Sequence, residues 1–191
     1  MSAKRAVIAG IPGVGKTTVI TRVRELLVRK GVAVEHVVFG TIMLEEAKKL
    51  GITDRDRMRT LPMSKQKELQ IKAASSIAQM TATVTLIDTH LFIRIRAGYL
   101  PGLPADILTT LAPTNLFLIE ASVADVISRR SSDTTRNREM TDVATIEMEI
   151  RLARGVLAAS SVISGCPIKI VRNENNMVDP TADEVFQALL E

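Results

Sequence analysis

Short apolar runs alternate along the chain with longer segments in which apolar residues recur at helical spacing. A short apolar run is typical of a buried strand, and a longer periodic segment is typical of an amphipathic helix. Strands and helices alternate, and the run at 116–119 is apolar throughout. The pattern therefore predicts an α/β fold of three layers, in which helices cover both faces of a mainly parallel sheet of about five strands. The predicted strands span residues 5–9, 34–39, 84–88, 115–120 and 168–171.

Residues that start or stop helices set the expected boundaries between these strands. Helices are predicted after the first strand and at 42–50, 64–80, 105–111, 124–130, 142–160 and about 181–190. Thr41 is expected to cap the helix at 42–50, and Thr181 with Glu184 resembles a capping box for the last helix. Two prolines and a glycine within 100–104 predict a bend rather than a regular element.

A glycine-rich segment directly after the first predicted strand carries the strongest chemical signal. Residues 10–18 fit the pattern Gly, four residues, Gly-Lys-Ser/Thr, and a predicted helix follows them. Because glycine lacks a Cβ, such a loop turns tightly and points N–H groups at an anion, and the helix N-terminus faces the same point. We expect Lys16 to reach terminal phosphates and the Thr17 hydroxyl to bind Mg²⁺. The flanking strand and helix argue against a chance glycine-rich turn with a surface lysine. The predicted phosphate loop consists of Gly10, Ile11, Pro12, Gly13, Val14, Gly15, Lys16, Thr17 and Thr18.

Asp88 ends the third predicted strand, so it belongs to the sheet edge that carries the glycine loop. A carboxylate at this place is suited to hold Mg²⁺, directly or through a bound water. The alternative is a helix cap or a solvated turn residue. His90 follows two residues later and is equally compatible with a site and with a structural hydrogen bond.

Arginines follow the predicted strands in three groups, and arginine offers planar donors that match phosphate oxygens. Phosphoryl transfer depends mainly on positioning and on charge neutralisation, which converging arginines provide. The polar loop at 131–137 is expected to act as a mobile lid over a nucleotide. The alternative for each arginine is a solvated surface position. The groups are Arg55, Arg57 and Arg59, then Arg94 and Arg96, then Arg129, Arg130, Arg136 and Arg138.

Composition narrows the class of protein. A chain of 191 residues, 46% apolar and 24% charged, is most simply one globular domain, and no apolar run approaches the roughly 20 residues that span a bilayer. The N-terminus shows no signal-peptide pattern, and the single Cys166 cannot form an internal disulfide, which favours a reducing cytoplasm. A net charge of +4 fits an anionic ligand and is too small to argue for nucleic acid. The Asn-Lys-x-Asp motif of GTPases and the Leu-Ser-Gly-Gly-Gln signature of transporter ATPases are absent, which favours a small kinase.

The chain resembles the archaeal type of adenylate kinase along nearly its whole length. The most particular matches are Asp-Thr-His at 88–90 and Gly-Tyr-Leu-Pro-Gly-Leu-Pro at 98–104, whereas the glycine loop is common to many phosphate-binding proteins. The Gly-Phe-Pro-Arg segment of bacterial adenylate kinases is missing, and 99–104 stands near its place. The other matching segments are 39–43, 54–59 and 129–138.

The resemblance implies a three-layer P-loop NTPase fold with a short lid, and reversible transfer of a phosphoryl group from Mg-ATP to AMP, giving two ADP. It implies that residues 10–18 and Arg129 bind ATP, with Lys16 as the catalytic cation, and that Thr17 and Asp88 hold Mg²⁺. AMP would be held by Thr41 and Arg59, which belong to an AMP-binding excursion at about 40–62, and by Arg94. Arg94 would also bridge the two phosphates. Arg136 and Arg138 would act catalytically from a lid at about 129–140. The backbone near 173–175 would touch the ATP adenine, and the resemblance also implies a homotrimer.

The residues themselves leave the acceptor open. A phosphate acceptor is already ionised at neutral pH and needs no general base, whereas a hydroxyl acceptor favours a nearby carboxylate, which Asp88 supplies. A small kinase for another nucleoside monophosphate or for a hydroxyl is therefore an alternative. A nucleotide-dependent switch or RNA-associated ATPase is a second alternative, which the basic pI of about 9.5 leaves open.

Overall fold

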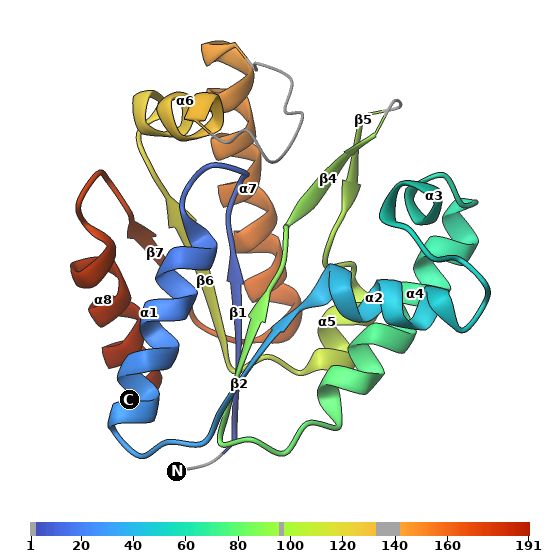
Figure 1. The fold of residues 1–191 in the computed structure, drawn as a ribbon, viewed down its shortest axis with the longest axis horizontal. Coiled ribbons are helices and arrows are strands. Elements are labelled where there is room, and N and C mark those ends of the chain that lie inside the picture. The colour runs from blue at the N-terminus through green and yellow to red at the C-terminus, as the bar shows by residue number, and fades with distance from the viewer. Residues whose placement is uncertain (1–2, 96–97, 133–141) are drawn as a thin grey trace.

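A five-stranded parallel sheet forms the centre of the molecule (Figure 1). The computed structural model describes residues 3–95, 98–132 and 142–191, without the side chains of Asp56 and Arg59. Every pairing within this sheet is parallel, which confirms the predicted sheet. The strand order is β2 (Val34–Val38), β3 (Val84–Asp88), β1 (Lys4–Ala9), β6 (Asn115–Glu120) and β7 (Ile168–Arg172).

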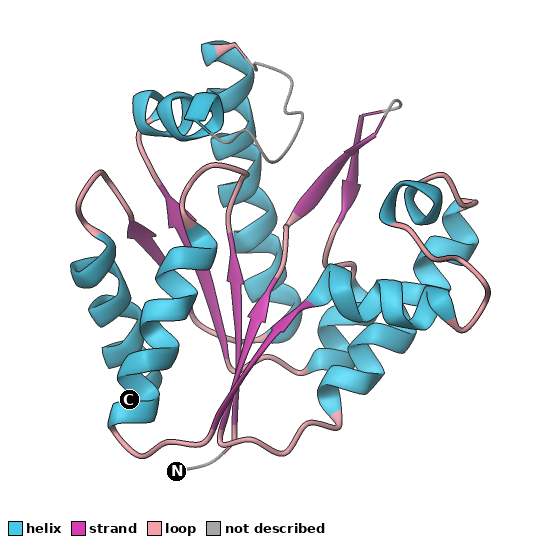
Figure 2. Ribbon diagram, in the orientation of Figure 1, coloured by secondary structure: helices cyan, strands magenta, loops and turns pink. Residues whose placement is uncertain are grey.

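Helices cover both faces of this sheet, which confirms the predicted three layers (Figure 2). On one face, α1 (Lys16–Arg29) packs against α8 (Val178–Leu190). On the other face, α5 (Ala105–Leu111) lies between α4 (Met63–Ala78) and α7 (Val143–Ser164) and contacts both. Among the residues that the structure describes, no helix is both long and apolar enough to span a bilayer.

The carboxyl ends of the strands carry the remaining elements (Figure 1). α2 (Phe39–Lys48) and α3 (Arg55–Arg59) follow β2, and all of their residues except Phe39 fall within the range 40–62 of the predicted excursion. An antiparallel hairpin of β4 (Phe92–Ile95) and β5 (Gly98–Pro101) follows β3. α6 (Val123–Ser132) follows β6 and includes the first residues of the predicted lid, whose other residues up to position 140 lie outside the described part of the chain.

Three local predictions from the sequence are wrong. Thr41 does not cap a helix, because α2 already begins at Phe39. The predicted bend at 100–104 is partly a strand, since β5 ends at Pro101, a terminal position where proline removes no needed ladder bond. Thr181 lies inside α8, where its hydroxyl donates to the carbonyl oxygens of Arg172 and Met177 instead of forming a capping box.

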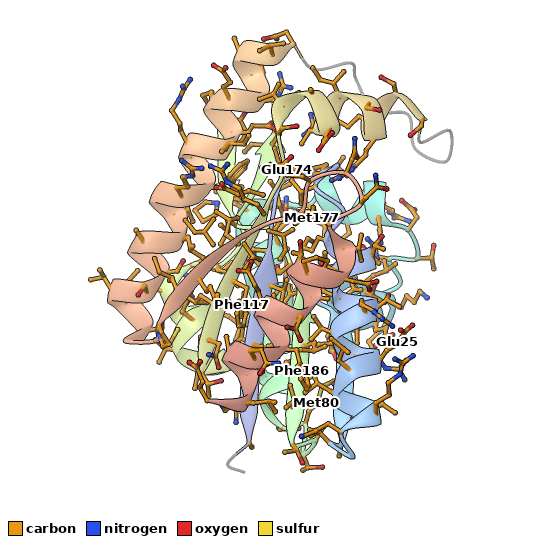
Figure 3. The ribbon with its side chains drawn as sticks, turned by 90° about the vertical axis from the view of Figure 1, so that its left-hand side faces the viewer. Glu25, Met80, Phe117, Glu174, Met177 and Phe186 are labelled. Carbon is orange, nitrogen blue, oxygen red and sulfur yellow. The ribbon has the colours of Figure 1, made fainter. Side chains whose placement is uncertain are left out.

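The interior explains why the central strands read as continuous apolar runs. Every residue of β3 is buried, and β1 and β6 are buried along most of their length. Figure 3 labels Phe117 on β6 and Phe186 on α8 in this interior, where they are 1% and 9% exposed. Burying such a side chain stabilises a fold by about 1.5–3 kcal/mol. Cys166 is also buried, as its small apolar character predicts.

Candidate active site

A cavity of about 500 Å³ opens at the carboxyl ends of the strands, which is where the topology of a parallel sheet places a ligand. Its size falls in the range of about 300–1,000 Å³ that is usual for small-molecule sites. The lining residues come from the glycine loop, the first turn of α1, the ends of β2 and β3, and the helices α2, α3 and α6. They are Ile11, Pro12, Gly13, Gly15, Lys16, Thr17, Thr18, Val38, Thr41, Arg55, Asp88, His90 and Arg129.

The glycine loop joins β1 to α1, as the sequence pattern predicts. Gly15 directly precedes α1 with φ of 80°, a left-handed conformation that glycine adopts without strain. A Cβ at Gly15 would lie 2.4 Å from the Nδ2 atom of Asn173, and one at Gly10 would lie 2.7 Å from the carbonyl oxygen of Ile119. Both positions therefore require glycine, because the loop is packed closely against its neighbours.

Lys16 and Asp88 form a buried ion pair, and both residues line the cavity. The Nζ atom of Lys16 donates to the Oδ1 atom of Asp88, and the two side chains are 9% and 7% exposed. A buried charge is tolerated only with a partner, and each of these two side chains supplies the other with one. Thr17 follows Lys16 and lines the same cavity. The structure thus brings together the three side chains that the sequence selected from two distant segments.

The predicted AMP residues fall in different places. Thr41 lines the cavity and accepts a hydrogen bond of 2.7 Å from Arg55, which lines it too. Arg94 lies on β4, exposed and in register with Tyr99, and is not among the lining residues. The side chain of Arg59 lies outside the described part of the structure.

The two arginines at the end of α6 contact the glycine loop itself. Arg129 donates to the carbonyl oxygens of Val14 and Asn173 at 3.1 and 2.9 Å while lining the cavity. Arg130 donates through Nε to the carbonyl oxygen of Pro12 at 2.9 Å. The predicted lid residues Arg136 and Arg138, like Arg96, lie outside the described residues.

Sequence reasoning did not assign the roles of three residues that the structure places at the site. The sequence indicates Arg55 only as one of three neighbouring arginines, yet this residue lines the cavity. Asn173 is 1% exposed and donates from Nδ2 to the carbonyl oxygen of Val14 at 2.8 Å. Glu149 is buried on α7 and accepts from Arg130 and from the Tyr99 hydroxyl. Burial, followed by the nearby Glu149 carboxylate, raises the pKa of Tyr99 and keeps its hydroxyl protonated as a donor.

Comparison with known proteins identifies relatives of this chain. A family model described as an AAA domain matches residues 9–147. An adenylate kinase of Methanoculleus marisnigri is 41% identical over 191 residues, which cover 99% of this chain and 100% of that protein. An adenylate kinase of Sulfurisphaera tokodaii is 40% identical over 193 residues, which cover 98% of this chain and 100% of that protein.

A solved structure shows the same fold at much lower identity. Shikimate kinase from Bacteroides thetaiotaomicron superposes with a TM-score of 0.61 and 12% identity, covering 98% of this chain and 99% of that chain. At such identity the likeness concerns the fold alone. The two adenylate kinases, by contrast, are 41% and 40% identical to this chain over nearly its whole length. The chain therefore belongs to the adenylate kinase family.

Proposed function

We propose that this member of the adenylate kinase family transfers a phosphoryl group reversibly from Mg-ATP to AMP, giving two ADP. The observation that carries the proposal is that one cavity joins the glycine loop with Lys16 to the side of α2 and α3 that bears Thr41 and Arg55. A donor phosphate on the loop and an acceptor phosphate near Arg55 would then face each other. Direct transfer requires this arrangement, because the attacking and leaving oxygens must lie roughly in line.

The donor half uses the backbone of the glycine loop and the N-terminus of α1 to bind the ATP phosphates. When phosphate enters, the Lys16 ammonium exchanges its contact with Asp88 for a phosphate oxygen. It then neutralises charge on the phosphoryl group as that group moves to AMP. Because an AMP phosphate is already ionised at neutral pH, this transfer needs no general base.

The residues around Lys16 also fit Mg²⁺ as the cofactor. Thr17 offers a hydroxyl oxygen and Asp88 a carboxylate, the hard oxygen donors that Mg²⁺ prefers. Few protein ligands suffice, since Mg²⁺ usually retains waters and takes phosphate oxygens as its other ligands. Bound Mg²⁺ supplies additional neutralisation of phosphate charge. We propose that Asp88 alternates between Lys16 in the free protein and the Mg²⁺ site in the loaded one.

The acceptor half is proposed to involve Thr41, Arg55 and Arg59, with Arg94 reaching in from the β4–β5 hairpin. Because Arg94 is exposed on β4 and does not line the cavity, the hairpin would have to approach the cavity when AMP binds. Arg136 and Arg138 are proposed to close over the transferring phosphate from the lid. Such arginines would exclude water and add positive charge at the moment of transfer.

An assay of acceptors tests the proposal. ATP is offered with AMP, CMP, GMP, UMP or shikimate, and ADP formation is followed with pyruvate kinase and lactate dehydrogenase. We expect AMP to support the highest kcat/KM by a wide margin. Turnover with another acceptor and none with AMP would overturn the proposal. ATP hydrolysis stimulated by RNA, without transfer to any acceptor, would favour a nucleotide-dependent switch.

We also propose that the chain works in the cytoplasm as a homotrimer, without a membrane or nucleic acid as partner. Exposed apolar side chains support self-association. They include Val162 and Ile163 of α7, which are 85% and 52% exposed, and Ile168 and Ile170 of the edge strand β7. Size-exclusion chromatography with light scattering should give three times the chain mass. A monomer at assay concentrations would contradict the trimer without affecting the catalytic proposal.

A further inference from the structure

Side chains from outside the glycine loop hold alternate carbonyl groups of that loop. The carbonyl oxygen of Gly10 contacts the Nδ1 atom of His90 at 3.2 Å, and since a carbonyl only accepts, Nδ1 is the donor. The carbonyl oxygen of Pro12 accepts from Arg130. The carbonyl oxygen of Val14 accepts twice, from Asn173 and from Arg129.

These contacts fix the direction of the N–H groups between them. In a trans peptide the N–H of one residue points opposite to the carbonyl of the residue before it, and the described residues contain no cis peptide bond. Holding the Pro12 and Val14 carbonyls outward therefore turns the N–H groups of Gly13 and Gly15 the other way. Gly13 and Gly15 line the cavity, whereas Arg130 and Asn173 do not. Arg130 and Asn173 therefore donate to the loop from outside the cavity.

Asn173 is built into the fold rather than placed on its surface. It follows β7, its backbone N–H donates to the carbonyl oxygen of Glu120 at 2.7 Å, and the residue is 1% exposed. Figure 3 labels Glu174 and Met177 in the same loop between β7 and α8. The Asn173 amide occupies the space that a Cβ at Gly15 would need. The loop conformation and the Asn173 side chain are therefore fitted to each other.

Arg130 is equally constrained. Its side chain and that of Glu149 are each 9% exposed, and their closest charged atoms lie 3.4 Å apart. Glu149 on α7 thus holds the guanidinium whose Nε reaches the Pro12 carbonyl. A Cβ at Gly13 would lie 3.1 Å from Cγ of Arg130, so this side chain also packs directly against the loop.

We propose that Asn173 and Arg130 are positioning residues that pre-organise the glycine loop for phosphate by fixing the Val14 and Pro12 carbonyls outward. Neither side chain needs to touch the nucleotide. Without these two side chains, the loop would lose conformational entropy when phosphate binds, because its N–H groups would no longer be held in place beforehand. The affinity for phosphate would therefore fall. The inference rests on the proposed role of the loop as the ATP phosphate site.

Binding of inorganic tripolyphosphate with Mg²⁺, measured by titration calorimetry, isolates this effect from contacts to adenine. Asn173→Leu removes the donor to Val14 with little change in volume. The double variant Arg130→Met with Glu149→Gln removes the donor to Pro12 without leaving a buried carboxylate unpaired. Ser160→Ala is the matched control, because it removes another buried donor to a backbone carbonyl, that of Val156 within α7, away from the loop and from Asn173.

We expect each test variant to bind tripolyphosphate and ATP about tenfold more weakly, by equal factors. This factor equals about 1.4 kcal/mol, which lies within the range for loss of one hydrogen bond. The KM for AMP should stay within twofold, and Ser160→Ala should bind both ligands like the parent chain. Parent-like affinity in both test variants would overturn the positioning role, even if their melting temperatures fell. Failure of the parent chain to bind tripolyphosphate would instead contradict the proposed function.

Discussion

Replacing Lys16 with methionine separates the catalytic role of the lysine from its role in the buried ion pair. Methionine retains much of the length of lysine but removes the ammonium group. The Asp88 carboxylate, whose side chain is 7% exposed, then loses its charged partner in the interior. Removing one member of a buried pair costs about 3–5 kcal/mol. We expect Lys16→Met to lower the free energy of unfolding at pH 7 by about this amount and to reduce turnover by orders of magnitude.

Asp88→Asn and the double variant complete a double-mutant cycle, with unfolding followed by circular dichroism in urea. The double variant contains no buried charge at this place, so it should be more stable than Lys16→Met alone by about 2 kcal/mol. It should remain inactive, because the cation is still missing. Recovery of stability without recovery of activity is the specific outcome that the structure predicts.

Two results would refute this reasoning. Stability changes that add within about 0.5 kcal/mol would show that the two residues are not coupled in the folded protein. Turnover of Lys16→Met close to that of the parent chain would show that the lysine does not act on the transferring phosphate. A matched substitution of Lys65, an exposed lysine on α4, provides the control for loss of a positive charge.

Three further outcomes are expected. In steady-state kinetics, Arg55→Ala should raise the KM for AMP about tenfold and leave the KM for ATP unchanged. The reason is that a hydrogen bond to a charged group is worth about 1.5–3 kcal/mol. Equal rises in the two KM values would contradict a role of Arg55 in binding the acceptor. Arg136→Ala should lower kcat by about 10³-fold in the same assay, whereas a change in the KM for ATP alone would make Arg136 a binding residue. Burial lowers the pKa of His36, so the unfolded chain takes up a proton first as pH falls. Above the ordinary histidine pKa, the free energy of unfolding includes the full contribution of neutral His36, and this contribution is lost as pH falls through the folded-state pKa. Urea unfolding should show a smaller loss of stability at low pH for His36→Gln than for the parent chain. Identical pH profiles of the two proteins would contradict this.

The parallel sheet could be predicted because its strands are buried on both faces, which leaves a continuous apolar run in the sequence. The β4–β5 hairpin could not, because it is short, carries Pro101 and Gly98, and contains few buried residues. Within the hairpin, the rings of Phe92 and Tyr99 pack edge to face with their centroids 5.1 Å apart. Such a local contact between two side chains leaves no periodic signal in the sequence.

The glycine loop was predictable because its function demands glycines at fixed spacing in a short segment. The residues that hold it were not, because they come from distant parts of the chain. Asn173 lies 159 positions from Val14, and Arg130 lies 118 positions from Pro12. Only the order β3-β1-β6-β7 brings the ends of these strands together. An isolated asparagine after a strand gives no indication of such a contact.

One cavity is proposed to hold the donor and the acceptor nucleotides together. A crystal structure with a two-headed mimic that joins ATP to AMP through their phosphates tests it most directly. We expect the donor phosphates on the glycine loop beside Lys16 and the acceptor end beside Thr41 and Arg55. A mimic bound with its AMP end outside this cavity, or with Lys16 still paired to Asp88, would contradict the account.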